Sequence, residues 1–134
     1  MMGVEDGSVS AKSVPAILIV EEDAALLDAW VALMTAAGYR VTGVRSFAEG
    51  RRAMSDSTPD LLLTDVRLGA YNGLQLVIRA RAANPSLRSI VVTGFPDPVV
   101  RREAEALDAM HLEKPVDLDE LRMLVASVLA DSAD

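Results

Sequence analysis

The sequence predicts an α/β fold in which five helices cover both faces of a five-stranded parallel sheet. Short apolar runs alternate with longer amphipathic segments five times along the chain. The run at 16–20 is apolar without interruption, which is typical of strands that are covered on both faces. Capping residues stand at the starts of most amphipathic segments, so the helix limits can be located. Alternation of strands and helices of this kind favours a doubly wound parallel sheet.

Five strands are expected. The first, at 16–20, and the fourth, at 89–93, are almost wholly apolar. The third, at 60–65, has three leucines between polar residues and ends in Asp65. The second, at 40–45, has only two valines, and the fifth, at 111–113, is short. These lengths are ordinary for strands of a globular domain.

Five helices are expected between and after these strands. Asp23, Ser46, Asp97 and Asp117 stand at N-cap positions, and Pro98 follows one of them as a first helical residue. Ser46 and Glu49 have the spacing of a capping box. The expected helices begin at Asp23 and end near Gly38, begin at Ser46, cover 73–83, cover 99–108, and begin at Asp117. Asn84 and Pro85 end the third helix.

Size and charge limit the function. At 134 residues the chain suits one domain, which we expect at 15–131, with a flexible tail at 1–14 and a short tail at 132–134. A net charge of -7 argues against direct binding of nucleic acid or of an anionic membrane. Cysteine is absent, so disulfides and thiolate sites are excluded, and a cytoplasmic location is expected.

Polar side chains stand at the carboxyl ends of four expected strands. They are Glu21, Glu22 and Asp23 after the first strand, Asp65 in the third, Thr93 in the fourth and Lys114 after the fifth. In open parallel sheets, ligands bind at the carboxyl ends of strands where the strand order reverses. If the first strand lies between the second and the third, the acid cluster and Asp65 meet at that point.

The chemistry of this set fits phosphoryl transfer. Neighbouring carboxylates repel by about 1–4 kcal/mol per pair near a surface, and a hard divalent cation such as Mg²⁺ would relieve this. A carboxylate can act as a nucleophile toward phosphorus, and an amine and a hydroxyl can neutralise phosphoryl oxygens. Asp65, Lys114 and Thr93 supply these three groups. Taken singly, these residues also have simpler interpretations: the acids at 21–23 as solvated caps of the helix that follows, Lys114 as a surface lysine and Thr93 as a strand residue in a turn.

Four segments together resemble the receiver domain of two-component response regulators, over roughly residues 15–130. They are 17–23 (ILIVEED), 62–68 (LLTDVRL) with Asn72-Gly73 beyond it, 91–94 (VVTG) and 113–116 (EKPV). The resemblance implies a flavodoxin-like fold with strand order 2-1-3-4-5. It implies that Asp65 accepts a phosphoryl group from a histidine kinase or phosphotransfer protein. The chain would then be a phosphoryl acceptor rather than an enzyme with a separate substrate, apart from self-catalysed phosphorylation and dephosphorylation.

The resemblance also assigns the remaining site residues. Glu22, Asp65 and the backbone carbonyl of Arg67 would hold Mg²⁺, with Glu21 in support. Thr93 and Lys114 would contact the phosphoryl oxygens, and the Lys114–Pro115 peptide bond would be cis. His111 stands where the family often has an aromatic switch residue, so Thr93 and His111 form the expected switch. As the single histidine, His111 has packing in the strand as its alternative role.

Two positions depart from the family pattern. Glu22 stands where aspartate is usual, and the extra methylene moves the carboxylate about 1.5 Å outward. Since Mg²⁺ demands near-octahedral geometry, this substitution is expected to weaken the metal site. Gly69 stands where proline is common, so a looser loop is expected at 69–73. Trp30 is expected to be a core residue.

Two other functions remain open. A binding module of the same fold that has lost phosphorylation would follow if Glu22 disables the metal site. An enzyme on a similar fold is disfavoured, because no Walker pattern occurs and the loop at 22–26 has no glycine to hold phosphates. The resemblance implies that protein partners, or a second copy of the chain, bind the face made by the fourth helix, the fifth strand and the fifth helix. That fourth helix carries Arg101, Arg102, Glu103 and Glu105, whose alternative role is a solvated face.

Overall fold

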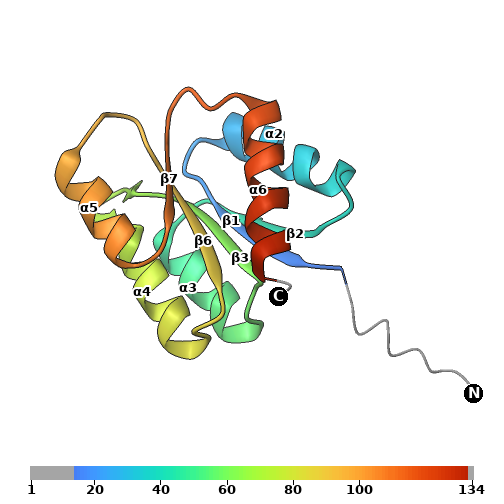
Figure 1. Ribbon diagram of the computed structural model, residues 1–134, viewed down its shortest axis with the longest axis horizontal. Coiled ribbons are helices and arrows are strands. Elements are labelled where there is room, and N and C mark those ends of the chain that lie inside the picture. The colour runs from blue at the N-terminus through green and yellow to red at the C-terminus, as the bar shows by residue number, and fades with distance from the viewer. Residues whose placement is uncertain (1–13, 133–134) are drawn as a thin grey trace, which may run out of the picture.

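A computed structural model describes residues 14–132 and contains a five-stranded parallel sheet in the order β2-β1-β3-β6-β7 (Figure 1). The strands are β1 (Ala16–Val20), β2 (Arg40–Val44), β3 (Leu61–Asp65), β6 (Arg88–Thr93) and β7 (Met110–Glu113). Counted within this sheet, the order is 2-1-3-4-5, so the predicted fold class is confirmed. The tails expected at 1–14 and 132–134 lie almost entirely outside the described residues.

Helices follow the strands as predicted. They are α2 (Ala24–Ala36), α3 (Phe47–Asp56), α4 (Leu74–Ala83), α5 (Pro98–Ala106) and α6 (Leu118–Ser132). The side chains of Asp23, Ser46 and Asp97 accept hydrogen bonds from first-turn amides of α2, α3 and α5, which satisfies donors that the helices leave unpaired. Within the described residues, no helix combines the length and the apolar character that crossing a bilayer requires.

Apolar side chains from the two faces of the sheet form two separate cores. On one face, β-strand residues pack against α2 and α6, and Trp30 and Met34 are fully buried there. On the other face they pack against α3, α4 and α5 (Figure 1). Because β1, β3 and β6 are buried on both sides, their apolar runs show no alternation. These rigid central strands position the polar residues that follow them.

One small element was not predicted. Arg67–Leu68 (β4) and Tyr71–Asn72 (β5) pair antiparallel and form a hairpin immediately after β3. Gly69 has φ +62°, a conformation that the turn requires and that other residues adopt at a cost. The expectation of a loose loop at 69–73 is therefore wrong: the segment is a tight hairpin beside the carboxyl edge of the sheet.

Candidate functional site

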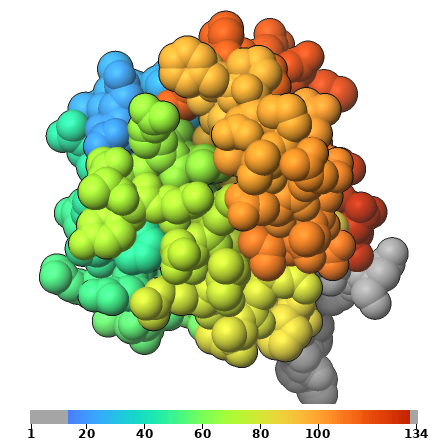
Figure 2. Space-filling model, turned by 90° about the vertical axis from the view of Figure 1, so that its left-hand side faces the viewer, coloured from blue at the N-terminus to red at the C-terminus, as the bar shows by residue number. Residues whose placement is uncertain are grey.

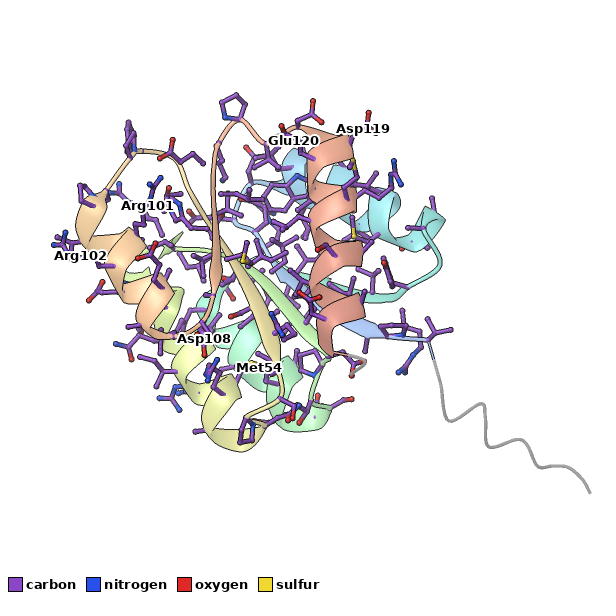
Figure 3. The ribbon with its side chains drawn as sticks, viewed as in Figure 1. Met54, Arg101, Arg102, Asp108, Asp119 and Glu120 are labelled. Carbon is purple, nitrogen blue, oxygen red and sulfur yellow. The ribbon has the colours of Figure 1, made fainter. Side chains whose placement is uncertain are left out.

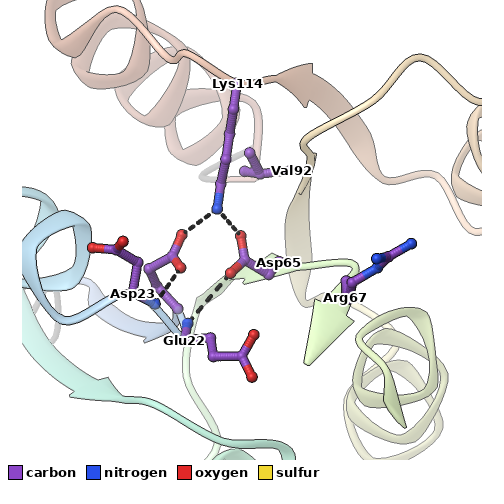
Figure 4. A pocket seen from close by; sticks show the side chains of 7 residues that line it. Glu22, Asp23, Asp65, Arg67, Val92 and Lys114 are labelled. Atoms are coloured by element: carbon purple, nitrogen blue, oxygen red, sulfur yellow. Dashed lines mark hydrogen bonds and ion pairs between the residues drawn. The ribbon is translucent and has the colours of Figure 1, made fainter. Parts of the chain in front are cut away.

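A pocket of about 340 Å³ opens at the carboxyl edge of the sheet, where β1 and β3 lie side by side (Figure 4). Its walls come from the ends of β1, β3, β6 and β7 and from the hairpin. The lining residues are Glu21, Glu22, Asp23, Asp65, Arg67, Val92 and Lys114. The structure thus brings together every predicted site residue except Thr93 and His111.

Lys114 is the central contact of this pocket. Its ammonium nitrogen lies 2.9 Å from Glu21 Oε1 and 3.0 Å from Asp65 Oδ1 (Figure 4). The backbone amide of Lys114 donates to the carbonyl of Thr93, which fixes the start of the loop after β7. The Lys114–Pro115 bond is cis, as the resemblance implied. Residues that are far apart in the sequence therefore form one ion-pair cluster.

Burial makes the Asp65 carboxylate costly to ionise. Glu21 is fully buried and Asp65 is only 4% exposed. The pKa of Asp65 is raised to about 7, first by burial and then by hydrogen bonding and repulsion from Glu21, while contact with Lys114 opposes the shift. Burial lowers the pKa of Lys114, but contacts with Glu21 and Asp65 outweigh this and leave that pKa raised. The pocket holds more negative than positive charge and would gain from a cation.

The donor atoms at this pocket suit Mg²⁺. The buried oxygens Glu21 Oε1 and Asp65 Oδ1 both contact the ammonium of Lys114, so two carboxylates share one cation there. Nearby ligand groups are carboxylate and backbone oxygens, without imidazole or thiolate. Among residues 14–132 no group of three or more His, Cys, Asp or Glu is arranged to hold a metal. Mg²⁺ takes only one or two protein carboxylates and keeps several waters, so the residues present still fit it.

Glu22 and Arg67 stand beside Asp65 in different ways. The amide of Glu22 donates to Asp65 Oδ2 over 3.3 Å. Its carboxylate points away from Lys114 toward the hairpin, where Oε2 lies 3.8 Å from the place a Cβ would take on Gly69 (Figure 4). The side chain of Arg67 points away from Asp65, which leaves its backbone as the part that could serve the pocket (Figure 4).

Thr93 and His111 lie next to the pocket and contact each other. The hydroxyl of Thr93 is 3.2 Å from His111 Nε2, and the two residues come from the neighbouring strands β6 and β7. Thr93 is buried and His111 is half-buried. In this arrangement the hydroxyl is engaged by the imidazole and does not line the pocket.

Trp30 has a contact that helical spacing could not reveal. It is a core residue as predicted, at 1% exposure. Its ring centroid also lies 6.0 Å from the ammonium of Lys114, within range of a cation–π interaction. An apolar position on an amphipathic helix gives no sign of which charged group it meets, so the sequence carried no signal for this contact.

The known proteins that this chain resembles include response regulators. The sequence model described as "Response regulator receiver domain" matches residues 17–126. The transcriptional regulatory protein GlrR of Escherichia coli K12 is 31% identical over 87% of this chain, which spans 27% of that relative. The response regulator receiver protein CpdR of Brucella abortus is 31% identical over 83% of this chain and 98% of its own length.

A solved structure shares the fold. The CheY-like receiver domain protein of Methanospirillum hungatei superposes with a TM-score of 0.85 at 27% identity, over 90% of this chain and 98% of that one. This likeness agrees with the observed fold and strand order. The chain therefore belongs to the response regulator receiver domain family of two-component systems.

Proposed function

We propose that Asp65 is the phosphoacceptor of this receiver domain and that its phosphorylation requires Mg²⁺. The observation that carries the proposal is the contact of Lys114 with both Asp65 and Glu21 at the floor of an open pocket. A carboxylate oxygen of Asp65 would form a bond to phosphorus while the bond from phosphorus to the donor nitrogen breaks. The donor would be a phosphohistidine of a sensor kinase or of a phosphotransfer protein in the cytoplasm.

Residues around Asp65 have distinct roles in this proposal. Lys114 is partly exposed at the pocket and would turn its ammonium to an equatorial phosphoryl oxygen as negative charge builds up there. Thr93 would donate its hydroxyl to another oxygen after leaving His111. The same groups would catalyse transfer from small phosphate donors and the later hydrolysis. When bound, Mg²⁺ supplies positive charge that neutralises a further phosphoryl oxygen.

The metal would be held by Asp65, Glu22 and the backbone carbonyl of Arg67, with Glu21 in support. Support for this set is the all-oxygen donor inventory and the position of these residues around one pocket. Glu21 is fully buried against Lys114, so its role is to add negative charge rather than to reach the solvent side.

Acetyl phosphate with Mg²⁺ tests the proposal. Intact-mass measurement should show one added phosphoryl group on the wild-type chain and none on Asp65→Asn. Lys114→Ala should slow labelling by about 10²-fold, as expected for loss of a charge that stabilises the transition state. Chelation of Mg²⁺ should abolish labelling. Equal labelling of wild type and Asp65→Asn would disprove the assignment.

We further propose that α5, β7 and α6 form the surface that meets protein partners, including a second copy of this chain. Exposed apolar side chains support this: Val99 in α5, Met110 in β7 and Leu118 in α6 are 53%, 43% and 44% exposed. Arg102 projects from the outer side of α5 (Figure 3). Sedimentation of the chain with and without beryllofluoride should show a shift toward dimer in the phosphoryl-like state, and Val99→Lys should abolish it.

A further inference from the structure

Residues 45–47, the turn between β2 and the first residue of α3, contribute no ligand to the proposed metal site. They contact the two segments that do, which are the loop of Glu22 and the β4–β5 hairpin. We propose that the stacked rings of Phe47 and Tyr71 hold the β4–β5 hairpin in place and so position the backbone of Arg67 for Mg²⁺. The inference deepens the proposed function and rests on it. Tyr71 and Phe47 are positioning residues in this account, because neither side chain lines the acidic pocket.

Ring stacking joins the hairpin to α3. The ring centroids of Phe47 and Tyr71 are 4.8 Å apart, and the ring planes are inclined by 13°. Phe47 is 9% exposed and belongs to the core beneath α3 and α4, so it is a fixed platform. Tyr71 is 61% exposed and makes this contact from the tip of a hairpin of only two residue pairs. A two-stranded hairpin this short is only marginally stable by itself. The stacking of Tyr71 on Phe47 therefore restrains it.

Arg67 belongs to this hairpin, and the pairing of the two strands places it next to the residues that are held in place. Tyr71 pairs with Leu68, and the adjacent pair is Arg67 with Asn72. Leu68 is buried in the same core as Phe47, and its cross-strand partner Tyr71 stacks on Phe47. The ribbon therefore has two anchors next to Arg67. Loss of one of them would let the Arg67 carbonyl move relative to Asp65, and Mg²⁺ tolerates such displacement badly.

The same turn also holds the loop of Glu22. Arg45, one residue before the α3 cap, donates from Nε to the carbonyl of Glu22 over 3.1 Å. The turn and the hairpin border a cavity of about 240 Å³ that shares Glu22 with the acidic pocket. Residues 45–47 thus contact both the acidic loop and the hairpin. Residues 45–47 provide no metal ligand themselves, and in this proposal they set the distance between the loop of Glu22 and the hairpin of Arg67.

Isothermal titration with MgCl₂ tests this inference on the whole chain. Tyr71→Ala should raise the Mg²⁺ dissociation constant about 3- to 10-fold, the factor expected from loss of one aromatic contact. Tyr71→Phe keeps the ring and should stay within about twofold of wild type. Ile78→Ala, which removes a 50% exposed apolar side chain from α4, is the matched control and should bind like wild type.

A double-mutant cycle separates positioning from general destabilisation. Phe47→Leu keeps an apolar side chain in the core but removes the stacking partner. If the two rings act through each other, Phe47→Leu with Tyr71→Ala should bind Mg²⁺ no more weakly than the worse single variant. Midpoints of thermal unfolding in EDTA should stay within a few degrees for Tyr71→Ala, which shows that the fold is intact.

The outcomes distinguish a failure of the positioning role of Tyr71 from a failure of the proposed phosphoacceptor and metal site. Unchanged Mg²⁺ affinity in Tyr71→Ala, with wild type binding normally, would overturn the positioning role and leave the phosphoacceptor assignment standing. Additive losses in the cycle would also overturn it. Failure of wild type to bind Mg²⁺, or equal binding by Asp65→Asn, would overturn the metal site and the inference with it.

Discussion

At the scale of single residues, Asp65 is held in an unfavourable charge state. Its carboxylate is buried next to Glu21, and one ammonium compensates the pair. Its pKa is raised to about 7, first by burial and then by Glu21. A group poised in this way gains from binding positive charge, which is the property that a metal-dependent phosphoacceptor needs.

Replacement of Asp65 should reveal the cost of ionising its buried carboxylate as a pH-dependent difference in the free energy of unfolding. Because the folded pKa is raised, the proton on Asp65 stabilises the fold fully below the ordinary value of 3.8, and this contribution is lost as pH rises through about 7. Asp65→Asn should therefore be more stable than wild type by about 1–3 kcal/mol at pH 8 in EDTA. The gap should close toward pH 4. Urea unfolding at both pH values measures it, and a variant that is less stable than wild type at pH 8 would contradict the account.

Shortening Glu22 should improve the metal site. Its carboxylate points toward Gly69 rather than Asp65, and one methylene fewer would draw it back over the pocket. Glu22→Asp should bind Mg²⁺ about 3- to 10-fold more tightly, a factor ordinary for changes near metal ligands. Trp30, the single tryptophan, lies near Lys114 and provides a fluorescence signal for the titration. Glu22→Gln is the control and should bind more weakly; weaker binding by Glu22→Asp would count against the geometry.

At the scale of elements, the hairpin after β3 depends on a close approach of two backbones. Gly73 donates its amide to the carbonyl of Val66, and any Cβ on Gly73 would overlap the carbonyl oxygen of Asp65. Gly73 thus closes the hairpin directly against the proposed phosphoacceptor. Only a residue without a side chain fits at this position.

Gly73→Ala should accordingly destabilise the protein by about 2–4 kcal/mol, because backbone must move to admit the methyl group. Gly94→Ala is a matched control, since nothing lies within 4 Å of its added Cβ. Equilibrium unfolding in urea compares the two. If both variants lose the same stability, the close approach at Gly73 is not the cause.

Sequence patterns predicted the main elements because their causes are local. An uninterrupted apolar run predicts a buried strand, and a capping side chain such as Asp23 or Asp97 marks a helix start wherever the chain then goes. The hairpin was harder to predict, because its two-residue strands carry no periodicity. Its geometry also depends on the close approach of Gly73 to the backbone of Asp65, which the sequence pattern does not display.

At the scale of the whole molecule, the carboxyl ends of the five parallel strands lie at one edge of the sheet (Figure 1). This arrangement was predictable, because carboxyl ends of parallel strands share an edge. The direction of each side chain was not, since packing and competing contacts decide it. Lys114 meets Glu21 as well as Asp65, and Thr93 meets His111 instead of the pocket.

The α5 side of the molecule is where a signal from the pocket would emerge. Strand β7 carries His111 and lies beside β6, and α4 and α5 are neighbours on the same face (Figure 2). Arg81 of α4 donates to the carbonyl of Leu107 directly after α5. Movement of Thr93 toward a phosphoryl group would release His111 and change the packing between β7 and this surface.

Release of His111 should be visible by NMR. The chain has one histidine, so its ring signals need no assignment by mutation. Beryllofluoride with Mg²⁺ should shift these signals in wild type, because the hydroxyl of Thr93 leaves Nε2. In Thr93→Ala the bond is already absent, and the shift should be much smaller. Unmoved histidine signals in wild type would contradict the coupling.

The central claim is that the pocket directs a phosphoryl group to one carboxylate, and chemical trapping tests it most directly. Borohydride reduces an aspartyl phosphate to homoserine, so peptide mass mapping after acetyl phosphate treatment locates the modified position. The account predicts homoserine at position 65 only, dependent on Mg²⁺. Homoserine at Asp23, hydroxynorvaline (the reduction product of a glutamyl phosphate) at Glu21 or Glu22, or no reduced residue in a folded and metal-loaded chain would contradict it.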